Sequence, residues 1–307
     1  MNKLKTIIVG VDFSECSRSA LEQAARMAEW NQANLRIIHA VEYLTISEAA
    51  EALRLNEDEI RSEIRQQAIT RLAAWAAEAG APAQHSREVI FGPPLDVLLQ
   101  EARTSSADLL VLGITGDSLL PYGAGTLATK CLRKAPCKVM LVKSTHARPF
   151  RRIVACVDFS ETSREAVVQA MRVAARDRAE VHLLHVFQPP SDFSALFSVR
   201  LPAMADFEKN YRQVLENNLR HFVGADPGVS SIYAVTEAKT HGHGIAEYCR
   251  RIDADLVILG TKGKTNLKYV LLGSTVERLL KEIPCSALVV RPPTAPRGDG
   301  VVSEPRN

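Results

Sequence analysis

The segment IIVGVDFS at residues 7–14 returns as IVACVDFS at residues 153–160, 146 residues further along the chain (position 158 against position 12). Both copies are apolar runs that end in Asp-Phe-Ser. Two later landmarks also repeat: ADLLVLG at 107–113 returns at 254–260 as ADLVILG, and Pro136-Cys137 returns as Pro284-Cys285. A domain-sized period with a slow drift in the offset is typical of a duplicated globular unit and not of a solenoid.

The duplication predicts two domains, at residues 1–146 and 150–292, followed by a proline-rich tail at 293–307 that we expect to be disordered. A length of 307 residues agrees with two domains. Hydrophobic residues make up 46% of the chain and charged residues 24%, which is typical of soluble proteins that bury a core.

Apolar, strand-sized runs alternate with amphipathic, helix-sized stretches within each copy. The near-continuous Val/Ile/Leu runs are typical of parallel strands that are buried on both faces. The sequence therefore predicts an α/β protein of two tandem, doubly wound, five-stranded parallel-sheet domains of Rossmann-like type. In the first copy we expect strands near 5–11, 34–41, 84–90, 108–113 and 137–142, and helices near 18–31, 47–79, 94–105 and 125–134. The stripe of apolar residues along the stretch 47–79 is interpreted as a packing surface.

Both copies end in an apolar strand led by Pro-Cys, at Lys138–Val142 and Ser286–Val290. Each would be an exposed sheet edge unless another element covered or paired with it. We therefore predict that the two copies pack as an internal pseudo-dimer. A homodimer of whole chains is a further expected assembly.

Composition and charge argue against several classes of function. The formal net charge is only +3 and basic residues are scattered among acidic ones, so neither nucleic acid nor a membrane surface is an expected partner. No apolar run is long enough to cross a bilayer, and the first one is too short for a signal peptide. The six cysteines show neither CxxC nor zinc-finger spacing, so we expect buried free thiols and a cytoplasmic location.

Ligands of open parallel sheets bind beyond the carboxyl ends of the strands, where the strand order reverses. In the second copy, the loop after one such strand reads Gly260-Thr261-Lys262-Gly263, and after nine intervening residues Gly273-Ser274-Thr275 opens a helix. The glycines permit close backbone approach. The helix start offers N–H groups and hydroxyls to an anion, and Lys262 and Lys264 add positive charge. Asp158, at the end of the first strand of this copy, can accept hydrogen bonds from a base or ribose.

The pattern Gly-x2-Gly-x9-Gly-[Ser/Thr] after a strand, with an Asp closing the first strand, resembles that of the ATP-binding universal stress proteins. The resemblance covers residues 4–144 and 151–291. It implies a stress-response protein that binds an adenine nucleotide, with ATP, with or without Mg²⁺, as its cofactor and with no metal cluster. By this resemblance Asp158 contacts the adenine and the backbone near Val186 lines the base pocket. The implied triphosphate site consists of Gly260, Lys262, Gly263, Gly273, Ser274 and Thr275.

The first copy departs from this pattern. Its loop, Gly113-Ile114-Thr115-Gly116, is followed by only eight residues before Gly125-Thr126, and it carries Asp117 where the second copy has Lys264. The missing residue is expected to shift the helix start relative to the first glycine pair, and the acidic residue disfavours phosphate. We predict a weaker, different or absent ligand in this copy. Its candidate site residues are Asp12, Ala40, Gly113, Gly116, Gly125 and Thr126.

Simpler interpretations of the same residues remain open. Asp12 and Asp158 could only cap the helices that follow them. We interpret His39 and His185, at strand ends, as packed or hydrogen-bonded structural residues. His241 and His243 form an HxH pair, which can hold a metal, but no third ligand stands at a recognisable spacing, so we predict no metal site.

Two other classes of function compete with nucleotide binding. One is an adenylating or slow ATP-hydrolysing enzyme of related α/β architecture, and the other is a ligand-free interaction module. Adenylating enzymes usually carry a Ser-Gly-Gly-rich loop or a His-x-x-His signature after the first strand, and the segment 157–160 has neither. No general base or nucleophile stands out beside the phosphate loop, so no catalytic residue is predicted. The complete loop of the second copy argues against a ligand-free module.

Overall fold

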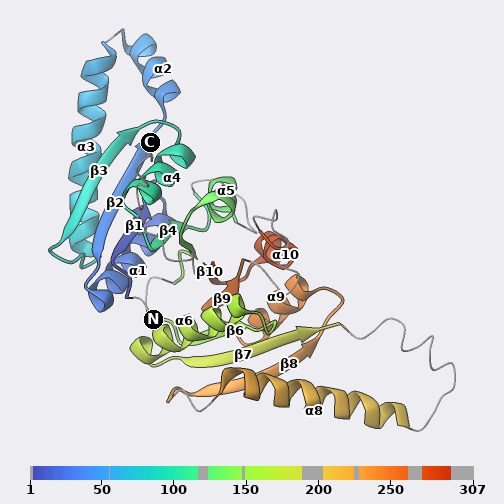
Figure 1. Ribbon diagram of the computed structural model, residues 1–307. Helices are drawn as coiled ribbons and strands as arrows, with labels where there is room; N and C mark the ends of the chain where they lie inside the picture. The colour runs from blue at the N-terminus through green and yellow to red at the C-terminus, as the bar shows by residue number, and fades with distance from the viewer. Residues whose placement is uncertain are drawn as a thin grey trace, which may run out of the picture.

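The computed structural model describes residues 3–54, 56–116, 124–146, 149–188, 203–224, 228–261 and 272–291. The predicted disordered tail, 293–307, lies outside these residues. In both halves strands alternate with helices, as the sequence predicts (Figure 1). The elements of the first half are β1 (Thr6–Gly10), α1 (Glu15–Asn31), β2 (Asn34–Val41), α2 (Tyr43–Leu53), α3 (Glu57–Glu78), β3 (His85–Phe91), α4 (Pro94–Thr104), β4 (Leu109–Gly113), α5 (Thr126–Lys134) and β5 (Lys138–Val142). Those of the second half are β6 (Arg152–Cys156), α6 (Glu161–Asp177), β7 (Glu180–Phe187), α8 (Ala203–Val223), β8 (Ser231–Glu237), α9 (His241–Arg251), β9 (Leu256–Gly260), α10 (Ser274–Glu282) and β10 (Ser286–Val290).

All ten strands form one sheet in the order β3-β2-β1-β4-β5-β10-β9-β6-β7-β8. Strand pairing is parallel within each half. In the first half, β2 and β3 are added on one side of β1, and β4 and β5 on the other, so the strand order reverses between β1 and β4. In the second half it reverses in the same way between β6 and β9. These two positions are the switch points at which ligands of doubly wound sheets bind.

Helices cover both faces of the sheet and bury two separate hydrophobic clusters. One cluster lies under α1, α3, α6 and α8, and it includes Leu21, Leu72 and Leu219. The other lies under α4, α5, α9 and α10, and it includes Leu98, Leu132 and Leu279. Each cluster contains residues of both halves, so the core is continuous across the domain junction.

The junction is an antiparallel pairing of β5 with β10. Met140 faces Leu288 in the ladder, with Leu141 opposite Ala287 and Val139 opposite Val289. Met140 and Leu288 occupy equivalent positions in the two copies, so a pseudo-two-fold axis passes between them. The predicted internal pseudo-dimer is confirmed, and it takes the form of two edge strands that satisfy each other's backbone groups.

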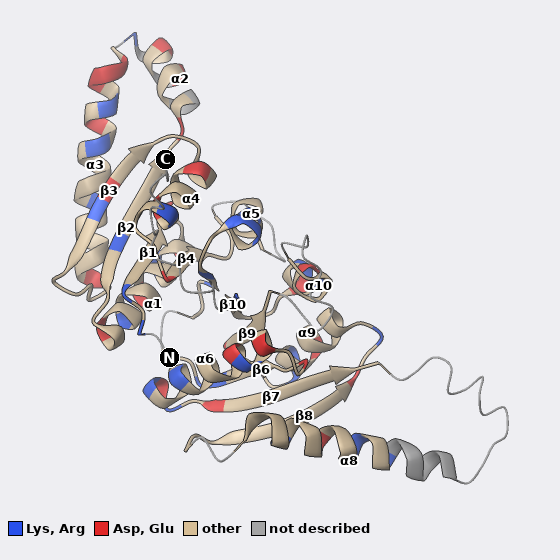
Figure 2. Ribbon diagram, viewed as in Figure 1, with Lys and Arg blue, Asp and Glu red and all other residues tan. Residues whose placement is uncertain are grey.

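The predicted single helical stretch over 47–79 is wrong, because the structure has two helices there. The first ends at Arg54, whose backbone is left-handed (φ 53°), and the second begins after Asn56, whose side chain accepts a hydrogen bond from the N–H of Asp58. Leu72 is fully buried against the sheet, which confirms that the apolar stripe is a packing surface. Within the described residues, no helix is both long and apolar enough to span a bilayer, and charged residues of both signs occur along α3 (Figure 2).

Candidate functional site

The turn after β6 places Asp158 at the switch point of the second domain. One carboxylate oxygen, Oδ1, accepts hydrogen bonds from the backbone N–H and the hydroxyl of Ser160, at 3.0 and 2.6 Å. Ser160 Oγ in turn accepts from the N–H of Ser163 at 3.2 Å and caps α6. Phe159 between them has a left-handed backbone (φ 64°). The helix cap is therefore Ser160, and Asp158 orients it through Oδ1, while among the described residues Oδ2 accepts no hydrogen bond.

The first domain repeats this turn. Asp12 Oδ1 accepts from the N–H and the hydroxyl of Ser14, at 3.0 and 2.6 Å, and Ser14 caps α1. Gly116 lies directly against this carboxylate, since a Cβ added to it would stand 2.8 Å from Asp12 Oδ2. The structure thus brings Asp12 and Gly116 together, as the sequence predicts. The corresponding glycine of the second domain, Gly263, lies outside the described residues.

The two strand-end histidines each form a hydrogen bond to the residue that precedes the Asp of the turn. His39 Nδ1 donates to the carbonyl of Val11 at 2.7 Å, and His185 Nδ1 donates to that of Val157 at 2.8 Å. Each imidazole also packs on the Phe of its turn, with ring centroids 4.7 and 4.6 Å apart. Burial lowers the pKa of His39. These contacts confirm the interpretation of both histidines as structural residues.

The glycines that end β4 and β9 have a packing role. A Cβ on Gly260 would stand 2.6 Å from Thr162 Cγ2, and one on Gly113 would stand 2.9 Å from Cys16 Cβ. Any larger residue would push the first helix of the domain away from the sheet. These contacts explain why both positions are glycine without reference to a phosphate.

The start of α10 is open toward the same sheet edge. Gly273 is its N-cap, no side chain caps its first N–H groups, and the Gly273 N–H donates to the carbonyl of Thr261 at 3.0 Å. Ser274 is exposed and Thr275 half-buried in the first turn. Uncapped N–H groups at a helix N-terminus carry a partial positive charge and attract anions. This end of α10 is therefore a candidate phosphate subsite.

The expected shift of the helix start in the first domain is wrong. Gly125, the N-cap of α5, donates its N–H to the carbonyl of Ile114 at 2.7 Å, and this bond matches that between Gly273 and Thr261. The N–H groups of Ile114 and Thr261 are themselves bonded to the last residues of β5 and β10. The helix start is therefore hydrogen-bonded to the strand end in the same way in both domains, although one residue fewer separates them in the first.

Sequence reasoning did not single out Thr261. The residue is only 2% exposed, and its hydroxyl has no hydrogen-bond partner. An unpaired buried hydroxyl costs free energy, so such a group is expected to have a role. The first domain has Ile114 at this position, which is 3% exposed. The replacement of an apolar Ile114 by a polar Thr261 at this buried position was the signal in the sequence that could have identified the residue.

Several predicted residues make no contact that bears on a ligand. Val186 is buried on β7 and packs on Gly244, and Ala40 is half-buried on β2. His243 Nδ1 pairs with Glu282 at 3.2 Å, while His241 is exposed. Across the described part of the chain, no three His, Cys, Asp or Glu side chains gather as a metal site would require. Three residues of the phosphate loops that carry charge, Lys262, Lys264 and Asp117, lie outside that part.

Comparison with known proteins gives two matches to one family model, that of the universal stress protein family, over residues 3–143 and 149–291. The chain is 26% identical over 315 residues to the universal stress protein E homolog of Haemophilus influenzae, covering 94% of this chain and 98% of that protein. A solved structure of a functionally unknown protein from Pseudomonas aeruginosa is 19% identical, with a TM-score of 0.64 and coverage of 94% and 93% of the two chains. A universal stress protein from Archaeoglobus fulgidus is 17% identical, with a TM-score of 0.63 and coverage of 93% and 98%. At these identities the structural likeness concerns the fold alone.

Proposed function

The chain belongs to the universal stress protein family, and from that premise we propose that it is an ATP-binding regulatory or protective protein of the stress response. The nucleotide site lies in the second domain, at the switch point between β6 and β9. One observation carries this proposal: the uncapped start of α10 is hydrogen-bonded to the end of β9, at the same sheet edge as the Asp158 turn.

The roles follow from the chemistry of the residues at that edge. The carboxylate of Asp158 keeps Oδ2 available to accept hydrogen bonds from a base or a ribose. The first N–H groups of α10 and the hydroxyls of Ser274 and Thr275 suit phosphate oxygens. Thr261 contributes a buried hydroxyl whose hydrogen-bonding capacity is unused. Lys262 supplies positive charge from the loop, and bound Mg²⁺ would offset the remaining charge of the triphosphate.

Binding without efficient turnover is the form of activity that these residues favour. Both strand-end histidines donate a hydrogen bond to a backbone carbonyl and pack on a phenylalanine ring. Asp158 accepts two hydrogen bonds within its turn. We place the protein in the cytoplasm, since all six cysteines have free thiols.

The proposal is tested by native mass spectrometry of the full chain purified without added nucleotide, followed by calorimetric titration with ATP. We expect one tightly held ATP per chain. Absence of any adenine nucleotide in the first measurement, together with no heat of binding at millimolar ATP, would overturn it. Hydrolysis of the bound ATP over many turnovers would favour the enzyme alternative over a binding protein.

A further inference from the structure

The pseudo-two-fold axis relates two niches that lie between α1 and α6 on one face of the sheet. The chain enters the two domains in the same way on either side of the axis. The N–H of Leu4 donates to the side chain of Asn31 at 3.3 Å, and that of Phe150 donates to Asp177 at 2.8 Å. The two niches therefore have equivalent frames, and their contents can be compared directly.

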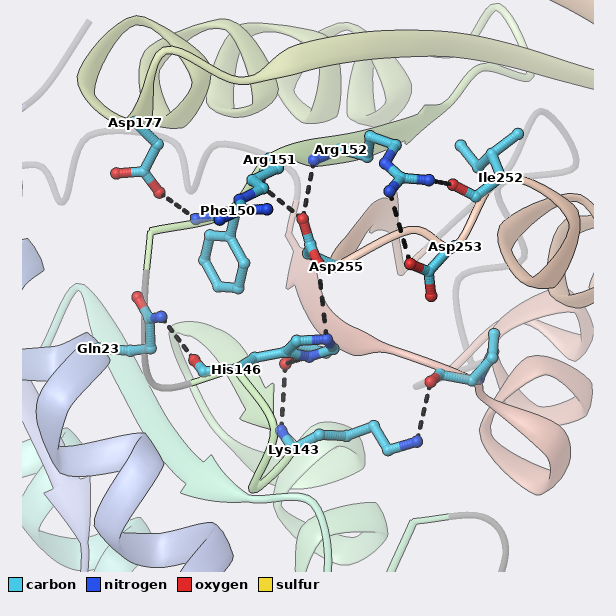
Figure 3. Close-up of polar contacts among 12 residues, drawn as sticks. Gln23, Lys143, His146, Phe150, Arg151, Arg152, Asp177, Ile252, Asp253 and Asp255 are labelled. Carbon is cyan, nitrogen blue, oxygen red and sulfur yellow. Dashed lines mark hydrogen bonds and ion pairs between the residues drawn. The ribbon is translucent and has the colours of Figure 1, made fainter.

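The first, which we call the linker niche, is bounded by Gln23, Asp177 and Ser286. It is filled by the described residues on either side of the domain boundary, among them His146 and Phe150 (Figure 3). Gln23 Nε2 donates to the carbonyl of His146 at 2.6 Å, and the His146 ring is 2.9 Å from Ser286 Oγ. Phe150 is 1% exposed. Residues of the linker therefore fill this niche at the domain junction.

The second, which we call the open niche, contains a cavity of about 380 Å³. Its lining includes Gln169 and Arg172, the counterparts of Gln23 and Arg26, and Lys138, the counterpart of Ser286. The cavity is therefore the pseudo-symmetric equivalent of the space that the linker occupies. Its volume lies in the range of small-molecule sites.

The lining of the open niche combines positive charge with apolar surface. Lys3, Lys138, Arg172 and Arg176 contribute to it, and among the described residues no Asp or Glu lines it. Lys138 Nζ forms an ion pair with Glu165 at 3.0 Å, and Glu165 is not among the residues that line the cavity. The apolar part consists of Leu4, Met27, Trp30, Leu109, Val173 and Leu288.

From this combination we propose that the open niche is a second ligand site, distinct from the nucleotide site, for a small organic anion with an aromatic or other apolar body. The anionic group would lie toward Lys3, which precedes β1, and Arg176, in the last turn of α6, and the apolar body would pack on Trp30 and the leucines. Cationic groups suit the anionic group and an aromatic ring suits the apolar body, so a lining that offers both favours amphipathic anions over inorganic phosphate.

A ligand in the open niche would touch both domains at once. The lining from the first domain includes Trp30 of α1, and that from the second includes Arg176 of α6 and Leu288 of β10. The same face holds the linker on the other side of the axis. Occupancy would therefore stabilise the domain junction in the way that the linker does opposite, and would raise the unfolding temperature by mass action.

The test uses the full chain, 2-naphthoate as the probe and the uncharged 2-naphthamide of nearly the same shape. Calorimetry is expected to show saturable binding of naphthoate in the presence of saturating ATP, and weaker binding of the amide. Because the chain has only two tryptophans, the Trp75→Phe variant leaves Trp30 as the reporter, and its fluorescence should change with naphthoate.

Charge reversal locates the site. Arg176→Glu is expected to raise the naphthoate Kd about tenfold, since an attraction becomes a repulsion. The matched control is Lys134→Glu, which reverses an exposed cation in the last turn of α5 on the opposite face of the sheet and should leave the Kd unchanged. The proposal is overturned if naphthoate does not bind, if ATP displaces it, if the amide binds equally well, or if the two reversals have the same effect.

Discussion

Ser14 donates its hydroxyl to Asp12 at 2.6 Å in the first domain, and Ser160 donates to Asp158 at the same distance in the second. The serines accept from the next helix at 3.2 Å in both domains. The two copies of the turn are thus nearly superimposable. Their agreement shows that this turn is part of the fold, because it begins a helix in each copy whatever that copy binds.

The two domains differ in the residues that follow β4 and β9 and in those that begin α5 and α10. The position after the strand is Thr261 in the second domain and Ile114 in the first, and the helix starts with Ser274-Thr275 against Thr126-Leu127. The second domain therefore presents three hydroxyls where the first presents one. We therefore expect the difference in ligand preference to arise from these side chains and not from the backbone of the turn, which the two domains share.

The largest effect is expected from a carboxylate at the start of α10. Ser274→Asp should stabilise the helix through its dipole and weaken ATP binding, at a cost to the binding free energy of about 2 kcal/mol or more. Thr126→Asp makes the same change in the first domain and should leave the tightly bound ATP in place. Calorimetry and thermal unfolding on both variants measure the two effects. Equal loss of ATP in the two variants would contradict the assignment of the site to the second domain.

The helix caps should respond equally in the two domains. Ser14→Ala and Ser160→Ala each remove one cap and should each lower the free energy of unfolding by about 1 kcal/mol. Urea denaturation of the full chain measures both. A cost confined to one domain would show that the turns are not equivalent in energy, although they are equivalent in geometry.

Much of the fold could be predicted from the sequence, because the repeated strands are continuous apolar runs with the same helix spacing. The pairing of β5 with β10 also followed from two apolar strands that would otherwise be edges. The break between α2 and α3 did not, since Arg54 adopts a left-handed backbone that only its surroundings impose. Propensity alone gives no signal for such a residue.

The candidate site was predictable in composition but not in detail. Asp158 and the helix start at Gly273 were expected at one edge, and the structure brings them there. The effect of the missing loop residue was not predictable, because it depended on whether Gly125 would bond to the carbonyl of Ile114. That bond holds the helix start in place, and a count of residues along the chain contains no information about it.

A smaller, pH-dependent effect is expected at the junction and within the first domain. Burial lowers the pKa of His146 and of His39, while Asp255 near His146 partly opposes this. Both histidines are easier to protonate in the unfolded chain. Their contribution to the free energy of unfolding is therefore fully present above a pH of about 6.5 and is lost as the pH falls below that value. Thermal unfolding at a pH of about 7.5 and about 5.5 measures the loss. His146→Asn should reduce the difference between the two midpoints, and an unchanged difference would show that this histidine does not contribute.

The smallest effect is expected where the two domains differ by one buried hydroxyl. Thr261→Val keeps the shape of the side chain and removes a group that has no partner, so the free energy of unfolding should stay constant or rise by up to about 1 kcal/mol. If the hydroxyl binds the nucleotide, ATP affinity should nevertheless fall by about 0.5–1.5 kcal/mol. The matched variant Ile114→Val should lower stability by about 1 kcal/mol through the lost methyl group and leave ATP affinity unchanged. Opposite signs for stability and affinity at Thr261 would distinguish a ligand-binding hydroxyl from a packing residue, because a residue that only packs changes both quantities together. Loss of stability in Thr261→Val with unchanged affinity would remove this residue from the site.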